Sequence, residues 1–295
     1  ANKGHDCYIG EKPEIYKLID KLKPIIYFDK GYHKEISEKI YDNLKRKNAI
    51  IINLDEEGAV DYSDNRTLFT RYPKKNFENL DLIFLWGEYQ FKVLKEKYNF
   101  KENKNIVISG HPRFQLLKNQ SILLNSNILN QISKKYGKYV LITSNCSIGN
   151  NLKGEKFVLS NYAKRIPDIE QVILSDKKKI DLLIKFTVNY AKESGSKIIF
   201  RPHPEENFET YKNAFKDYNN IIINCDFSSI LWIYNADLIV RPDCTTGIEA
   251  SILGKNVISL LPKLDNQYIT EIPVKMSLLY SDPYKLSKDL IENKI

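Results

Sequence analysis

The segment 236–255 carries hydroxyl and carboxylate side chains in a pattern suited to holding a nucleotide. It predicts a buried strand, a short polar turn and a helix that opens at Gly247. The unpaired N–H groups and the positive dipole end of such a helix favour an anion, and the hydroxyls of Thr245 and Thr246 add donors. Glu249, in the first helical turn, is placed to accept hydrogen bonds from a ribose. A plain N-cap would explain the same residues without a ligand.

A second polar segment, 201–206, follows the apolar run 197–200, which predicts another buried strand. Two prolines, one of them Pro204, stiffen this loop and keep it from becoming helical. Arg201 is a natural partner for phosphate oxygens, and His203 can donate to a phosphate or transfer a proton. We expect Arg201 and the threonine turn to form one cationic pocket for a nucleotide at the carboxyl edge of a parallel sheet. The alternative is a proline-rich surface loop.

A third loop follows the strand predicted over residues 139–143. Asn145 and Ser147 are candidate phosphate contacts there, and Gly149 would let the backbone come close to the ligand. A plain connection explains these small polar residues equally well.

Three acids leave a predicted strand in the first half of the chain, where residues 49–53 precede Asp55, Glu56 and Glu57. Glycosyl transfer needs a base for the acceptor hydroxyl, or a carboxylate that stabilises an oxocarbenium-like centre. Glu57 is our first choice for this role, ahead of Glu56 and Asp55. The alternative is a solvated acidic turn that ends at Gly58.

Three further residues of the first half are candidates for substrate contacts. Lys30 follows the strand predicted over 24–28 and could meet a sugar carboxylate or a phosphate, while His111 and Arg113 follow the strand predicted over 105–109. Solvated or structural roles explain them about equally well. Because Arg, His and backbone dipoles handle the phosphate charge, we expect no essential metal. We also expect no cofactor beyond a nucleotide-sugar co-substrate.

Apolar runs alternate with amphipathic segments along the chain, which predicts an α/β fold with parallel sheets and right-handed crossovers. Strands are expected over 24–28, 49–53, 80–85, 105–109, 139–143, 197–200, 220–224, 237–240 and 256–260. Helices are expected over 32–47, 88–98, 118–136, 177–194, 207–217, 228–234, 247–253 and 284–293.

The alternation restarts near residue 138, which predicts two Rossmann-like domains facing a central cleft. The expected parts are an acceptor-side domain over 1–118, a linker helix over 119–137, a nucleotide-binding domain over 138–262 and a segment over 263–295 that packs back toward the first domain. Residues 1–10 look like the end of a helix followed by a second strand. The first domain is therefore expected to lack its first strand.

Composition narrows the class of protein. The 295 residues are 42% hydrophobic and 28% charged, as in a soluble globular chain, and no run approaches a membrane span. Four scattered cysteines indicate reduced thiols in the cytoplasm. The net charge of +8 is spread along the chain, and its basic clusters lack interleaved aromatics, which argues against nucleic-acid binding. Attraction to phosphates, to anionic saccharides or to the inner face of the plasma membrane is compatible with this charge.

Several of these segments together resemble the bacterial surface carbohydrate biosynthesis proteins. The segments are 54–58, 86–88, 110–114, 201–205 and 244–250. The resemblance implies a GT-B glycosyltransferase of lipopolysaccharide or capsule assembly. This family is similar, more distantly, to enzymes that use CMP-Kdo and to CDP-glycerol-dependent teichoic acid polymerases. Both of those carry a His-Pro element beside the cytidine nucleotide, which implies the same role for His203 and Pro204.

The sequence thus predicts a glycosyltransferase that moves a sugar from a nucleotide donor to a surface polysaccharide, lipopolysaccharide or lipid-linked glycan. A cytidine donor is favoured, with CMP-Kdo-like sugars first and CDP-linked donors second. Alternatives are a nucleotide-sugar epimerase or hydrolase of the same shape, a CDP-linked polyol-phosphate transferase, and a non-catalytic subunit of a glycan assembly complex. Retaining and inverting chemistry are both compatible with the sequence.

Overall fold

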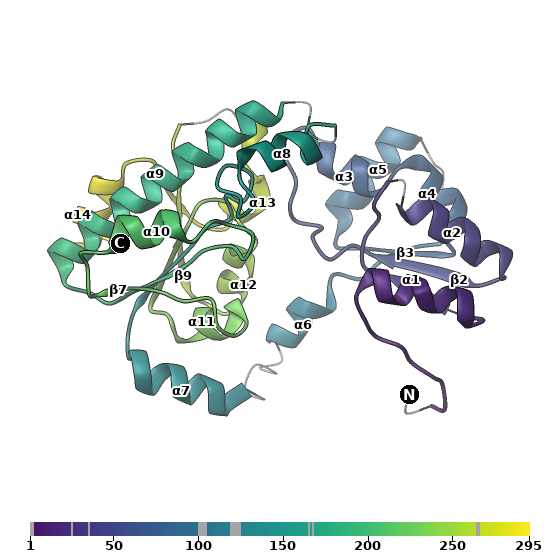
Figure 1. Ribbon diagram of the computed structural model, residues 1–295, viewed down its shortest axis with the longest axis horizontal. Coiled ribbons are helices and arrows are strands. Elements are labelled where there is room, and N and C mark those ends of the chain that lie inside the picture. Colours follow the sequence, from purple (N-terminus) through teal and green to yellow (C-terminus); the bar gives the residue numbers. More distant parts are fainter. Residues whose placement is uncertain are drawn as a thin grey trace. The chain divides into compact units, whose positions relative to one another are not determined.

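The computed structural model describes residues 3–24, 26–34, 36–99, 105–118, 125–164, 166, 168–263 and 266–295. It divides into two compact units (Figure 1). The first comprises Ala1–Gly58 and Asn65–His111, and the second comprises Ala59–Asp64 and Pro112–Ile295. Each unit is built on one parallel sheet, which confirms the predicted α/β class.

The first unit holds a four-stranded sheet in the order β1-β2-β3-β4. Its strands are β1 (Ile26–Asp29), β2 (Ile50–Leu54), β3 (Leu82–Leu85) and β4 (Ile106–Ile108). Its helices are α1 (Lys12–Lys21), α2 (Ile36–Arg46), α3 (Arg66–Arg71), α4 (Lys74–Asn79) and α5 (Glu88–Tyr98).

The strand order of this sheet follows the chain in one direction, so right-handed crossovers place the connecting helices on the same face. On that face Ile51, Ile83 and Leu85 pack in one cluster with side chains of α2, α3 and α5. On the other face Ile26 and Phe28 are each 57% exposed.

The prediction of a strand near the amino terminus is wrong. Residues 5–11 carry no regular structure, and Ile9 is 98% exposed because no neighbouring strand pairs with this segment. Helix α1 follows, with a proline in its first turn, and was not predicted.

The second unit holds a six-stranded sheet in the order β10-β9-β8-β5-β6-β7, and all of its strand pairs are parallel. Its strands are β5 (Val140–Thr143), β6 (Ile198–Arg201), β7 (Ile221–Ile223), β8 (Leu238–Arg241), β9 (Asn256–Leu260) and β10 (Leu278–Tyr280). Its helices are α6 (Pro112–Lys118), α7 (Ser126–Tyr136), α8 (Glu155–Tyr162), α9 (Ile169–Ser194), α10 (Glu209–Phe215), α11 (Ser229–Asn235), α12 (Thr246–Ile252), α13 (Glu271–Lys275) and α14 (Pro283–Ile291), with the 3-10 turn η2 (Asn266–Tyr268).

The strand order of the second sheet reverses at β5. The chain runs from β5 outward to β6 and β7, then returns to place β8 on the opposite side of β5. The loops after β5 and β8 therefore leave the sheet toward opposite faces, at the place where doubly wound sheets commonly bind their ligands.

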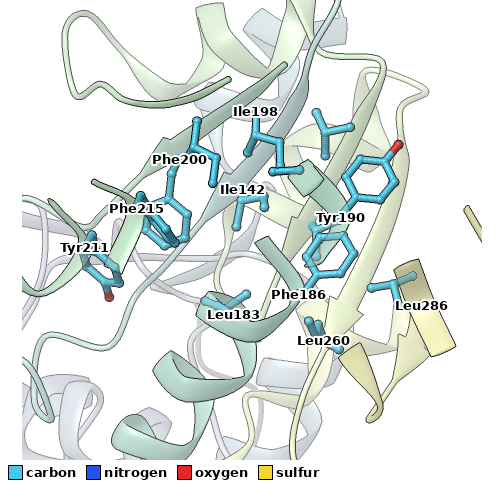
Figure 2. Close-up of a cluster of buried hydrophobic side chains, with 14 of the residues drawn as sticks. Ile142, Leu183, Phe186, Tyr190, Ile198, Phe200, Tyr211, Phe215, Leu260 and Leu286 are labelled. Atoms are coloured by element: carbon cyan, nitrogen blue, oxygen red, sulfur yellow. The ribbon is translucent and has the colours of Figure 1, made fainter. Parts of the chain in front are cut away.

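Both faces of the central strands of this sheet are buried, which explains their continuous apolar runs. On one face Ile142 and Phe200 pack with Leu183 and Phe186 of α9 and with Leu286 of α14 (Figure 2). On the other face the central strands pack against α7 and α11, in a cluster that includes the buried Trp232.

The carboxyl-terminal helix α14 belongs to the second unit. It packs along α9, and its Leu286 is fully buried. The sequence instead predicted that this segment packs toward the first domain. Helix α9 also begins at Ile169, earlier than predicted, because Ile169 and Ile173 bury themselves against Val158 of α8.

No helix among the described residues is both long and apolar enough to cross a bilayer.

We expect Leu286→Ala to lower the free energy of unfolding by about 2–5 kcal/mol, because it leaves a cavity between α14 and α9. Urea unfolding followed by circular dichroism measures this effect. Ile291→Ala, at a 38% exposed position of the same helix, is the matched control and should change stability far less. Equal effects of the two substitutions would contradict the placement of α14.

Candidate functional site

A cluster of hydroxyl and thiol groups lies at the reversal point of the second sheet. The Oγ1 atoms of Thr143 and Thr246 are 3.1 Å apart. The Sγ atom of Cys244 lies 2.6 Å from the Thr246 hydroxyl and 3.5 Å from that of Thr143. The end of β5 and the turn after β8 are thus joined by side chains that can donate hydrogen bonds to a ligand.

Thr245 stands at the N-cap position of α12, but its side chain makes no capping hydrogen bond. The plain N-cap explanation of this threonine therefore fails on geometry. The Gly247 N–H, which we expected to meet a phosphate, donates instead to the Cys244 carbonyl at 3.2 Å.

Gly247 is required for a different reason. A Cβ atom at this position would lie 2.1 Å from Nε of Arg241, whose side chain is fully buried beneath the turn. Sequence reasoning missed Arg241 because a polar residue at the end of a strand is normally taken to be exposed.

Glu249 and Arg113 are brought together within the second unit. Their side chains approach to 3.5 Å between Oε1 and Nε, and Glu249 is 8% exposed. Burial raises the pKa of the Glu249 carboxyl, and the Arg113 guanidinium acts in the opposite direction. The sequence had assigned these residues to a ribose and to a separate substrate contact.

Arg201 does not join the threonine turn, contrary to our expectation of one cationic pocket. Its guanidinium donates to the carbonyls of Asn224, Asp226 and Phe227, in the loop after β7. That loop lies on the far side of β6 from β5. In this arrangement Arg201 fixes a loop, and its side chain is directed away from the reversal point.

His203 presents its ring at the surface of the same edge. Its Nδ1 accepts the Glu205 N–H at 3.3 Å, so in the neutral imidazole the proton lies on Nε2. The following Pro204 is exposed and continues the turn.

The fully buried Glu206 holds two of the edge loops together. Its carboxylate accepts hydrogen bonds from the Ser144 hydroxyl, the backbone N–H groups of Cys146 and His203, and the Tyr211 hydroxyl. Its position shortly after the two prolines of the turn is the one sequence signal for this role.

In the loop after β5, the Oδ1 atom of Asn145 is buried without a hydrogen-bond partner. Ser147 is half-buried, and its carbonyl accepts a hydrogen bond from the Asn151 side chain. Gly149 is needed because a Cβ there would lie 2.5 Å from the Cβ of Asp176 on α9. Gly149 was expected to let the backbone approach a phosphate, but in the structure it lets the loop approach α9.

Beneath these loops lies a buried charge cluster that was not predicted. Lys179 of α9 contacts both carboxylate oxygens of Asp243, at 3.0 and 2.9 Å. Asp243 also accepts the Thr270 N–H. The turn after β8 is therefore anchored to α9 and to the segment before α13.

In the first unit, cations neutralise the acidic turn after β2. Arg71 contacts Asp55 at 2.8 Å and Glu57 at 2.5 Å, while Lys30 contacts Glu56 at 2.8 Å. Burial raises the pKa of Asp55, and Arg71 opposes this shift.

The three acids differ in access. Asp55 is only 4% exposed, whereas the side chain of Glu57 is 57% exposed. Glu57 is therefore more accessible to a substrate than Asp55, and its catalytic role stays a prediction.

His111 packs its ring against Trp86, with the ring centroids 5.0 Å apart. Among the side chains that the structure describes, no group of three or more His, Cys, Asp or Glu could hold a metal ion. The expectation of metal-independent chemistry stays a prediction.

No protein-family model and no curated protein matches the sequence. Solved structures with similar folds include the UDP-GlcNAc 2-epimerase of Methanocaldococcus jannaschii in complex with UDP-GlcNAc and UDP. It has a TM-score of 0.59 and 16% identity, over 94% of this chain and 71% of that one. S. aureus MnaA with UDP has a TM-score of 0.59 and 13% identity, over 99% and 74% of the two chains.

The wall teichoic acid polymerase TagF, soaked with CDPG, is also similar. Its TM-score is 0.54 at 17% identity, over 90% of this chain and 62% of TagF. The chain therefore spans less than two thirds of that enzyme. Identities this low indicate a common fold alone. They confirm the α/β fold with two parallel-sheet domains that the resemblance implied.

The buried acid Asp176 should make stability depend on pH. Burial raises its pKa to about 7, although Lys179 and the Gly149 N–H favour its ionised form; Asp243, Glu206 and Cys146 lie in the same cluster. The folded protein then keeps a proton that the unfolded chain loses near pH 4, so stability falls as pH rises from about 4 to about 7.

In Asp176→Asn this group can no longer titrate. We therefore expect the decrease in the free energy of unfolding between about pH 4 and pH 7 to be smaller by up to about 4 kcal/mol than in the wild type. Urea unfolding at pH 4.5 and pH 8 measures it. Asp181→Asn, at an exposed position of the same helix, is the control and should leave the pH dependence unchanged. An unaltered pH dependence in Asp176→Asn would refute the raised pKa.

Proposed function

We propose that this protein is an enzyme of nucleotide-sugar chemistry, a glycosyltransferase that moves a sugar from a nucleotide donor to a bacterial surface glycan. The observation that carries the proposal is the hydroxyl cluster of Thr143, Cys244 and Thr246 at the reversal point of the second sheet. Doubly wound sheets bind nucleotides at this place. The similar folds of structures that hold UDP-GlcNAc, UDP or CDPG support the ligand class.

In this proposal the phosphate lies against Thr245 and Thr246, with Asn145 and Ser147 on the opposite loop. The side-chain oxygen of Asn145 is buried without a partner within the described structure, and as an acceptor it suits a donor group of the ligand beside the phosphate. A nucleotide hydroxyl or an exocyclic amino group could satisfy it. Glu249, oriented by Arg113, is the proposed ribose contact.

The proposed donor is a cytidine nucleotide, CMP-Kdo-like first and CDP-linked second. The His-Pro element of His203 and Pro204 supports a cytidine base by resemblance, whereas two of the similar structures hold UDP. Cytidine and uridine nucleotides are therefore both included in the binding experiment. The acceptor is a polysaccharide or a lipid-linked glycan, and association with the inner face of the plasma membrane is part of the proposal.

A nucleotide-sugar 2-epimerase is the second candidate function. The similarity to the archaeal epimerase extends over most of this chain and favours it. An epimerase would change its nucleotide sugar in the absence of any glycan acceptor, whereas a transferase needs one.

Isothermal titration with CMP, CDP, UDP and GDP tests the site. We expect Thr246→Val to weaken the best of these ligands by about tenfold or more, because a hydrogen bond to a charged group is lost without a change in volume. Thr187→Val, at a buried hydroxyl of α9 that donates to the Leu183 carbonyl, is the control. Absence of binding by all four nucleotides would overturn the proposed function.

Product analysis separates the two candidate reactions. The wild type, incubated with the nucleotide sugar that binds best, should leave it unchanged until a glycan acceptor is added. Glu57→Gln should abolish transfer while nucleotide affinity stays within about twofold, since the proposed base lies outside the nucleotide contacts. Conversion of the sugar at its second carbon without an acceptor would establish the epimerase instead.

A further inference from the structure

Arg241 is a fully buried cation at the end of β8. Its Nη1 donates to the Pro242 carbonyl at 3.0 Å, and its Nη2 donates to the Pro273 carbonyl and to the Ser277 hydroxyl, the latter at 3.4 Å. Its Nε has no hydrogen-bond partner. All of these partners are neutral groups.

Among the described residues no carboxylate forms an ion pair with this guanidinium, although Cys244 and Asp243 nearby electrostatically favour its charged form. Asp243 lies two residues further along the chain, but both of its carboxylate oxygens are engaged by Lys179. None of the ion pairs within the described ranges includes Arg241. Burial lowers the pKa of Arg241, yet a guanidinium stays protonated in proteins, so a fixed positive charge remains. A buried charge without a partner is costly and calls for an explanation.

We infer that Arg241 is the fixed charge that makes the 243–247 turn select ligands that carry phosphate, although it does not touch the ligand. The guanidinium lies directly behind the turn, since a Cβ at Gly247 would be 2.1 Å from its Nε. The field of a charge in this buried setting is poorly screened and extends to the far side of the turn. The inference rests on the proposed function, which places a phosphate there, and it replaces Arg201 as the source of positive potential.

Ser277 provides a way to cancel the charge without altering Arg241. Its hydroxyl is 3.4 Å from Nη2, and its side chain is half-buried. In Ser277→Asp a carboxylate would pair with the guanidinium. The asparagine of Ser277→Asn has nearly the same volume as the aspartate of Ser277→Asp but carries no charge, so Ser277→Asn is the matched control.

The experiment titrates UDP, CDP, the nucleosides uridine and cytidine, and pyrophosphate into both variants. We expect UDP, CDP and pyrophosphate to bind about tenfold more weakly to Ser277→Asp than to Ser277→Asn, as for a unit charge about 10 Å away. The nucleosides should bind both variants equally. Arg241→Gln should lose the same affinity and Arg241→Lys should regain it, with circular dichroism to verify folding.

Equal affinities of the phosphate ligands for the two Ser277 variants would overturn the inference. So would an equal loss for nucleosides, because it would mark a structural effect of the substitution. If nucleotides fail to bind while pyrophosphate still separates the variants, the proposed function fails and the inference stands. If neither binds to Ser277→Asn, both fail.

Discussion

The reversal of strand order at β5 is the constraint on which the rest of the second unit depends. Right-handed crossovers force the connections on the two sides of β5 onto opposite faces of the sheet, so the loops after β5 and β8 must separate. At the base of that divergence the hydroxyl oxygens of Thr143 and Thr246 lie 3.1 Å apart. In the first unit the strand order never reverses, and its carboxyl edge carries a turn of paired charges instead.

Buried polar groups hold the separated loops in place. Glu206 fixes the loops after β5 and β6, and the Lys179–Asp243 pair fixes the turn after β8. Desolvation makes such groups expensive, and each is stable only because its hydrogen bonds are satisfied. An edge that is fixed before a ligand arrives loses less conformational entropy on binding, which suits a site that must orient phosphate groups.

The sequence predicted β1 to β9 because each is a short apolar run in a parallel sheet, and this pattern depends only on local composition. The edge strand β10 was missed, and its leucines are exposed. Helices α1, α3, α4, α6, α8 and α13 were missed. The start of α9 was placed too late because its contact with α8 is set by residues far from its lysine-rich centre. The threonine turn and Glu249 were proposed as ligand contacts from residue type and spacing, and this stays a prediction.

Other features depend on tertiary contacts that no local pattern encodes. The direction of Arg201 is decided by carbonyl groups of the loop after β7, which lie 23 to 26 residues further along the chain. The burial of Arg241 is decided by Pro273 of α13 and by Ser277, which precedes β10. A sequence can therefore indicate which polar residues reach a sheet edge, but not which of them neighbouring loops will engage.

The central claim is that a nucleotide phosphate lies between the loops after β5 and β8. A crystal structure of the protein soaked with CMP or UDP tests it most directly. The account predicts phosphate density within hydrogen-bonding distance of the hydroxyls of Thr245 and Thr246, with the guanidinium of Arg241 behind the turn. Well-ordered nucleotide density beside Arg201, away from the threonines, would contradict it.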